Sequence, residues 1–124
     1  MTQTLAIAGG GALGALLRFW ISGWVYGLLG RGFPYGTLAV NVLGSLAMGA
    51  GYVLLLERYA LGPEWRAFLL VGLLGAFTTF STFSLETFNL IEDGEVLRAA
   101  ANLVGSVLLC VLAAWLGILL GRQL

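Results

Sequence analysis

The hydrophobic positions of the chain fall into four long apolar stretches that are separated by short polar connections. The stretches are Leu5–Leu29, Pro34–Leu56, Trp65–Ile91 and Val96–Leu120. A helix needs roughly 20 mostly apolar residues to cross the hydrocarbon core of a bilayer, so each stretch is long enough to span it. Because these stretches use nearly the whole chain, the pattern predicts an all-α integral membrane protein with four transmembrane helices.

Composition agrees with this prediction and excludes several functions. Of the 124 residues, 60% are hydrophobic and 10% are charged, whereas soluble domains are about 45–50% apolar and about 25% charged. The chain has no histidine and only one cysteine, Cys110, which argues against zinc sites and excludes an intramolecular disulfide. The net charge is zero without a basic run, so we expect no nucleic-acid binding.

The N-terminus carries no basic residue ahead of the first apolar stretch. Secretory signal peptides have a positively charged segment at that point. We therefore expect the first stretch to be retained as a membrane span.

Arginines are almost evenly divided between the two ends of the predicted bundle. Arg58, Arg66 and Arg122 fall near one side of the membrane, and Arg31 and Arg98 fall near the other. Since arginine and lysine usually mark cytoplasmic loops, this balance predicts almost no preferred orientation. Two interpretations stay open: the charge signal is weak, or the chain inserts both ways up and forms an antiparallel homodimer.

Small residues recur at four-residue spacing along the spans. The pairs are Gly10/Gly14, Gly23/Gly27, Ser45/Gly49 and Gly117/Gly121. Such pairs put small side chains on one helix face and let two backbones approach closely within a membrane. They predict close helix packing, and the small size of a four-helix unit indicates oligomerisation.

Two rows of small polar residues run along the second and fourth spans, also at four-residue steps. The rows are Thr37, Asn41, Ser45 and Gly49, and Asn102, Ser106 and Cys110. Each row can be interpreted as contacts between helices, with hydrogen bonds worth about 0.6–2 kcal/mol. Polar side chains deep in a membrane are costly and tend to be functional, so two rows led by asparagine favour a polar pathway.

The third span contains the unusual segment GAFTTFSTFSLE, from Gly75 to Glu86. Gly72 and Gly75 precede a run of β-branched and hydroxyl residues, and this combination weakens a helix. A break near Gly75–Thr79 would free backbone carbonyls, which broken membrane helices use to bind cations. The alternative is a continuous helix whose serines and threonines bond to their own carbonyls.

A continuous helix would place Thr79, Thr82, Phe83 and Glu86 on one face, with Phe80 about 60° from Phe83. Glu86 is also a candidate proton site or a partner for Arg18, because charges inside a membrane usually find partners.

Three phenylalanines of this segment, Phe77, Phe80 and Phe83, have the three-residue spacing of a packing ridge. Aromatic rings also carry a positive edge around a negative face. A ring edge that faces a narrow polar path can therefore favour an anion without a fixed charge. Asparagine amides, hydroxyl groups and ring edges together suit a small, hard, strongly hydrated anion.

At the level of motifs, the chain resembles the Fluc (CrcB) fluoride channels of bacterial membranes. The resemblance covers essentially the whole chain. It rests on the glycine-rich start Gly9–Ala15 that leads to Arg18, on Gly36–Asn41 with Gly44 and Ser45, and on Gly75, Thr78–Ser84 and Glu86.

The resemblance implies a dual-topology antiparallel homodimer in the bacterial plasma membrane that exports fluoride passively through two pores at the subunit interface. Asn41 would be the pore amide, and Phe80 and Phe83 would turn ring edges toward fluoride. The further residues of the pathway would be Ser81, Thr82, Thr37, Asn102 and Ser106. The family often has an aromatic hydroxyl where Asn102 stands, so this chain departs from the pattern there.

The resemblance also implies a structural sodium ion at the centre of the dimer. Main-chain carbonyls of Gly75 and Thr78 from both subunits would hold it, and it would not be transported. The partners would then be fluoride, the lipid bilayer and a second copy of the chain, or a related subunit. No enzymatic activity is expected.

Two other functions compete with this interpretation. A small multidrug exporter coupled to protons would use Glu86, although resemblance to that class would require a glutamate in the first span, where Arg18 stands instead. A structural subunit without transport activity would use the polar rows only for packing.

Overall fold

The computed structural model describes residues 1–124 and is helical throughout. The first span is α1, Thr2–Leu29, and the second is α2, Tyr35–Tyr52, which continues as the π-helical segment η1, Val53–Arg58. The third span consists of α3, Pro63–Arg66, η2, Ala67–Leu74, α4, Gly75–Phe77, and α5, Phe80–Glu92. The fourth span is α6, Val96–Gln123.

The predicted all-α architecture is confirmed, with four helices that are long and apolar enough to cross a membrane. The helices extend a few residues beyond the apolar stretches at several ends. Their last turns include polar residues such as Arg58 and Gln123. Hydropathy alone therefore underestimates helix length, because backbone hydrogen bonding continues into the polar surroundings of each end.

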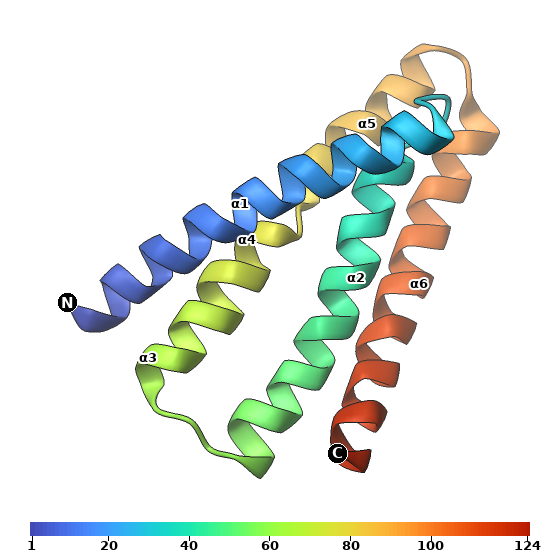
Figure 1. The fold of residues 1–124 in the computed structure, drawn as a ribbon. Coiled ribbons are helices and arrows are strands. Elements are labelled where there is room, and N and C mark those ends of the chain that lie inside the picture. The colour runs from blue at the N-terminus through green and yellow to red at the C-terminus, as the bar shows by residue number, and fades with distance from the viewer.

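Two glycines reverse the chain at one end of the molecule. Gly30 ends α1 with φ 83°, and Gly94 has φ 78° between α5 and α6. Glycine adopts this left-handed conformation without a steric penalty. Both turns lie at the same end of the bundle, while the connection from η1 to α3 and the C-terminus lie at the other end (Figure 1).

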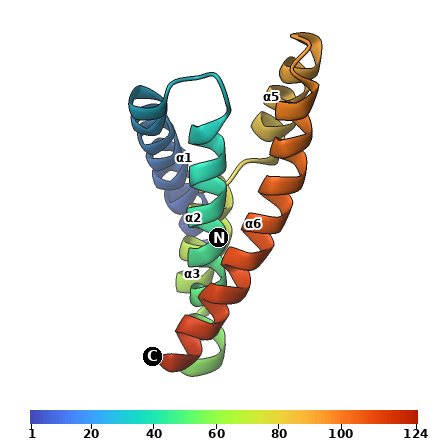
Figure 2. The same ribbon diagram turned by 90° about the vertical axis from the view of Figure 1, so that its right-hand side faces the viewer.

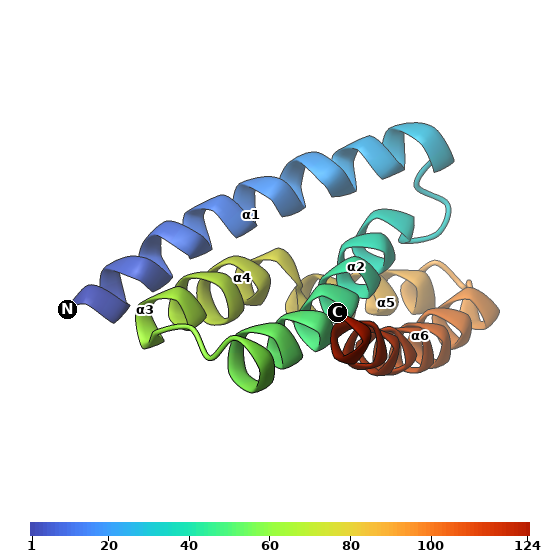
Figure 3. The same cartoon turned by 60° about the horizontal axis from the view of Figure 1, so that its bottom comes forward.

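The helices pack as two main pairs, α1 with η2 and α2 with α6. Helix α2 also contacts α1. In the view of Figure 3, α1 and α6 lie on opposite outer sides and α2 passes between them. Helix α5 contacts α6 much more than α2, and Figure 2 shows it lying along α6, away from α1.

Glycines permit both of the main helix pairs. A Cβ atom on Gly14 would lie 2.1 Å from Leu73 O, and one on Gly117 would lie 2.1 Å from Leu46 O. The predicted packing role of the Gly10/Gly14 and Gly117/Gly121 pairs is thus confirmed. The Gly23/Gly27 pair differs, because a Cβ on either residue would meet nothing within 4 Å. That face of α1 takes no part in packing inside the chain.

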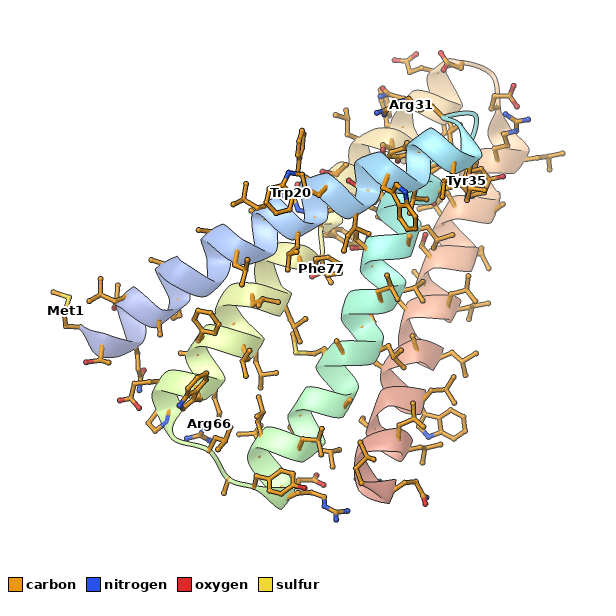
Figure 4. The ribbon with its side chains drawn as sticks, in the orientation of Figure 1. Met1, Trp20, Arg31, Tyr35, Arg66 and Phe77 are labelled. Atoms are coloured by element: carbon orange, nitrogen blue, oxygen red, sulfur yellow. The ribbon has the colours of Figure 1, made fainter.

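The interior of a single chain is small. Only 20 of the 124 residues are buried, and the two large side chains that are completely buried are Val40 and Val53. Many large apolar side chains are exposed, among them Trp20 on the outer side of α1 (Figure 4). An apolar surface of this extent requires hydrocarbon or another protein chain as its surroundings.

Candidate functional site

The third span is broken between α4 and α5. Thr78 (φ −89°, ψ 157°) and Thr79 (φ −149°, ψ 122°) are extended. The hydroxyl of Thr79 then begins α5 by accepting a hydrogen bond from Thr82 N at 3.3 Å. The predicted break is confirmed, and the alternative of a continuous helix is wrong.

Asn41 of α2 holds the break through both ends of its amide group. Its Nδ2 donates to Thr79 O at 3.0 Å, and its Oδ1 accepts from Thr79 N at 2.8 Å. The two chain segments approach closely at this level, since a Cβ on Gly44 would lie 2.3 Å from Thr78 Cγ2. Phe77 lies in the middle of the molecule at the same level (Figure 4).

The carbonyl groups at the break differ in their hydrogen bonds. Ala76 O accepts from Arg18 Nε at 3.0 Å, and Thr79 O accepts from Asn41. Gly75 and Thr78 lose their helical donors, because Thr79 N donates to Asn41 and Thr82 N donates to Thr79 Oγ1. Carbonyl oxygens of this kind fit a hard cation such as sodium. The chain contains no group of three or more acidic, histidine or cysteine side chains for another metal.

A groove of about 400 Å³ opens beside the break. It is lined by Asn41, Thr79, Phe80, Phe83 and Ser106, and also by Ser45, Met48 and Cys110. Four of the sequence-predicted pathway residues, from three different spans, thus meet at one surface: Asn41, Phe80, Phe83 and Ser106.

The two phenylalanines of the groove differ in exposure. Phe83 is 6% exposed and Phe80 is 77% exposed. Their rings lie 5.4 Å apart at an angle of 46°. The ring of Phe80 therefore projects from the chain, whereas Phe83 is fixed within it.

Asn102 lies behind the groove rather than in its lining. It is 2% exposed, donates from Nδ2 to Thr87 Oγ1 at 2.7 Å, and accepts from Ser106 Oγ at 3.1 Å. Thr87 in turn donates to Phe83 O at 2.8 Å. This buried chain of hydrogen bonds joins α6 to α5.

A second, polar cavity of about 220 Å³ lies on the other side of the break. Its lining includes Arg18, Tyr26, Thr37, Thr82 and Glu86. The predicted common face of α5 is therefore wrong in part. Thr82 and Glu86 face this cavity, Phe83 faces the groove, and Thr79 lies outside the helix and borders both spaces.

Arg18 and Glu86 line the same cavity but form no ion pair. The two ion pairs of the chain are Arg98–Glu95 and Arg122–Glu57, both at the ends of the bundle. Glu86 Oε2 instead accepts from Tyr26 OH at 2.7 Å, and Glu86 Oε1 is buried without a partner. Two predicted pathway residues remain. Thr37 Oγ1 lies 3.3 Å from Tyr26 OH. Ser81 is exposed and borders neither the groove nor the polar cavity.

Tyr26 and Arg31 also border a third cavity of about 240 Å³, together with Glu86, Asn89 and Asp93. The guanidinium of Arg31 lies 4.4 Å from the ring centroid of Tyr26, a distance at which cations interact with aromatic rings. Tyr26, Arg31 and Glu86 therefore separate an outer cavity near the α1–α2 turn from the inner one.

Sequence reasoning missed Tyr26 and Thr87 as members of the site. A tyrosine near the end of a membrane span, such as Tyr26, is usually an interfacial anchor. Thr87 is one of several hydroxyl residues in its helix, and its sequence position alone does not distinguish it from the others. The available signal for Thr87 was its position four residues after Phe83, where its hydroxyl can reach the Phe83 carbonyl.

A comparison with protein-family models matches residues 5–118 to the CrcB-like proteins, described as camphor resistance (CrcB). The match covers most of the chain, including the break and the residues that line the groove and the two polar cavities.

Curated relatives of this chain carry the name fluoride-specific ion channel FluC. A protein of Methylococcus capsulatus is 58% identical over 119 residues, which are 96% of this chain and 52% of that protein. The chain thus spans about half the length of this relative. Proteins of Geotalea uraniireducens and Geobacter metallireducens are 50% and 51% identical over 124 residues, the full length of both partners in each comparison.

Proposed function

The chain belongs to the CrcB-like protein family, and on this premise we propose that it is a fluoride-specific ion channel of a bacterial membrane. It is a channel and not an enzyme, and it crosses the membrane with four helices. The observation that carries the proposal for its pathway is the groove in which Asn41, Phe80 and Phe83 meet beside the broken third span.

This groove offers what a small hydrated anion requires. Fluoride must exchange its water for hydrogen-bond donors. Asn41 has a second N–H beside the one that it donates to Thr79 O, whereas Ser106 can offer its hydroxyl proton only by releasing Asn102 Oδ1. The positive edges of the Phe80 and Phe83 rings stabilise an anion without binding it as tightly as a fixed cation would. Thr37, Thr82 and the buried Asn102–Ser106 pair extend the polar surface on either side.

An antiparallel homodimer completes the pathway. The groove is open in one chain, and the ring of Phe80 is 77% exposed. A second copy in the opposite orientation would cover both and would create two pores at the interface. The Gly23/Gly27 face of α1, which contacts nothing inside the chain, is available for the same assembly.

A structural sodium ion would stabilise the dimer at its two-fold axis. The carbonyls of Gly75 and Thr78 would hold it, two from each subunit. Gly75 is exposed at the surface of the chain, and both carbonyls have lost their helical donors. The ion would supply positive charge near the anion path and would not itself be transported.

Passive conduction suffices for fluoride export. Fluoride enters cells in acidic surroundings as neutral HF, dissociates inside and is trapped as the anion. A membrane potential that is negative inside then drives the anion outward through a selective pore. The arginines that border the polar cavities, Arg18 and Arg31, argue against a cationic substrate.

Anion efflux from liposomes that contain only this protein tests the proposal. Fluoride release is followed with a fluoride electrode, at symmetric pH, beside a matched chloride assay. We expect rapid fluoride release, no chloride release and no dependence on a proton gradient. Absence of fluoride release from folded protein would contradict a self-sufficient channel and would point to a partner subunit or to drug export through Glu86.

A further inference from the structure

The side chain of Asn41 pairs with Thr79 in the way that one β-strand pairs with another. Its amide donates to Thr79 O and accepts from Thr79 N, at 3.0 and 2.8 Å. Both bonds can form only while Thr79 is extended, with φ −149° and ψ 122°. Asn41 therefore fixes the backbone on both sides of this residue.

This pairing decides which carbonyls at the break are free. In a continuous helix, Thr79 N would donate to Gly75 O, and Thr82 N would donate to Thr78 O. Here Thr79 N donates to Asn41 Oδ1. The extended Thr79 then offers its hydroxyl to Thr82 N, at 3.3 Å.

Two of the other three carbonyls of the segment Gly75–Thr79 have side-chain partners. Ala76 O accepts from Arg18, and Thr79 O accepts from Asn41. Hydrogen bonds from two neighbouring spans thus satisfy the carbonyls that alternate with Gly75 and Thr78. Gly75 O and Thr78 O lack partners of the kind that Ala76 O and Thr79 O have.

We propose that Asn41 is the positioning residue of the cation site, which it builds by keeping Thr79 N away from Gly75 O. The inference rests on the proposed sodium site of the channel. Asn41 also lines the groove with Phe80 and Phe83. One side chain therefore connects the anion path to the cation site, and loss of its hydrogen bonds weakens sodium binding as well as fluoride conduction.

The surroundings of Asn41 keep it in this position. The preceding residue, Val40, is completely buried. One turn later, Gly44 lies so close to the break that a Cβ atom there would clash with Thr78 and crowd the ring of Phe77. Helix α2 is consequently held close to the break, which keeps the amide of Asn41 within reach of Thr79.

Two substitutions separate the hydrogen bonds of Asn41 from its size. Asn41→Leu keeps the branched shape of the side chain, with a somewhat larger volume, and forms neither bond. Asn41→Asp keeps the oxygen that accepts from Thr79 N but adds a negative charge to the anion path. The unfolding temperature of each purified protein is measured by tryptophan fluorescence against sodium concentration, with N-methylglucamine maintaining the ionic strength. Fluoride efflux is measured on the same preparations.

We expect sodium to raise the unfolding temperature of the native protein, as a ligand of the folded state does. Asn41→Leu should need about tenfold more sodium for the same rise, since both hydrogen bonds that keep Thr79 N away from Gly75 O are lost. Asn41→Asp should keep most of the sodium response while its fluoride efflux falls. Ser45→Ala is the control, because Ser45 lines the same groove without bonding to the break, and its sodium response should match the native one.

The outcomes distinguish this inference from the proposed function. If Asn41→Leu shows the same sodium response as the native protein, Asn41 does not position the site. Fluoride efflux from the native protein would still support the channel. If sodium does not change the unfolding temperature of the native protein, both the cation site and this inference are overturned. The fluoride efflux of the native protein still tests conduction independently. Should Asn41→Leu fail to fold, Asn41→Ala gives the same comparison with a smaller side chain.

Discussion

Glu86 shows what sequence can and cannot establish about a single residue. Its position identified a charged group inside the membrane that needs a partner. The structure places it in the cavity that Arg18 also lines, yet its partner is Tyr26, which lies 60 positions away in the sequence. No local pattern encodes that contact. The buried and unpartnered Oε1 is likewise a property of the fold rather than of the segment.

The substitution Glu86→Gln should change the fluoride efflux rate modestly and leave the preference for fluoride over chloride intact. Glutamine keeps an oxygen that can accept a hydrogen bond from the Tyr26 hydroxyl. The substitution removes the charge of a carboxylate whose second oxygen is buried without a partner. Tyr26→Phe should instead destabilise the protein by about 1–3 kcal/mol, because the carboxylate loses its hydrogen bond. Efflux assays and unfolding curves on both variants measure these effects.

An obligatory proton step would give a different result for Glu86→Gln. Flux would then be lost although assembly remained normal, and the passive channel would be contradicted. Equal stability of Tyr26→Phe and the native protein would show that the Tyr26–Glu86 hydrogen bond contributes nothing to folding.

At the scale of helices, the sequence predicted the break but not what maintains it. Gly75 and the hydroxyl-rich run after it lower the helix propensity locally, and the interruption follows at Thr78 and Thr79. The Asn41–Thr79 pairing joins residues 38 positions apart. It could be inferred only once α2 was known to pass beside the break.

Glycine spacing likewise predicted which helix faces can pack closely but not what packs against them. Gly10/Gly14 and Gly23/Gly27 form identical patterns on α1, yet only the first pair meets a neighbouring helix within the chain. The spacing identifies a face that can pack closely. Which helix, or which subunit, occupies that face depends on the tilt of α1 across the bundle (Figure 1).

The buried Asn102–Thr87 hydrogen bond should be a main attachment of α5 to α6. Thr87→Val keeps the shape of the side chain but leaves Asn102 Nδ2 without its acceptor, so we expect a loss of about 0.6–2 kcal/mol in stability. Thr87→Ser retains the hydroxyl and should lose less. The midpoint of unfolding in denaturing detergent compares the two variants. Equal losses would mean that packing, and not the hydrogen bond, holds α5.

For the whole molecule, charge balance and small interior lead to the same conclusion. Arg31 and Arg66 lie near opposite ends of the bundle (Figure 4), and the remaining arginines of the loops are similarly divided. Nearly balanced arginines and an interior of only 20 of 124 residues both favour the proposed assembly of two opposed copies. The sequence predicted this balance directly, because arginine positions relative to spans do not depend on packing.

Labelling of single cysteines in cells tests whether both orientations occur. Cys110→Ser removes the one native thiol, and Gly62→Cys or Asp93→Cys then places a thiol in an exposed loop at either end of the bundle. If insertion has no preferred direction, a membrane-impermeant maleimide should label about half of each variant from outside. Complete labelling at one loop and none at the other would contradict dual topology.

Added charge should then change these fractions in a defined direction. Lysines at Tyr59 and Leu61, in the connection from η1 to α3, would favour a cytoplasmic position for that loop. Labelling of Gly62→Cys should fall and that of Asp93→Cys should rise. If the working channel is an antiparallel dimer, fluoride efflux should fall as one orientation becomes scarce. Efflux should return when a second copy is co-expressed that carries lysines at Glu92 and Asp93 instead, because these lysines favour the opposite orientation. Efflux that persists from chains of one uniform orientation would require a parallel or monomeric pore.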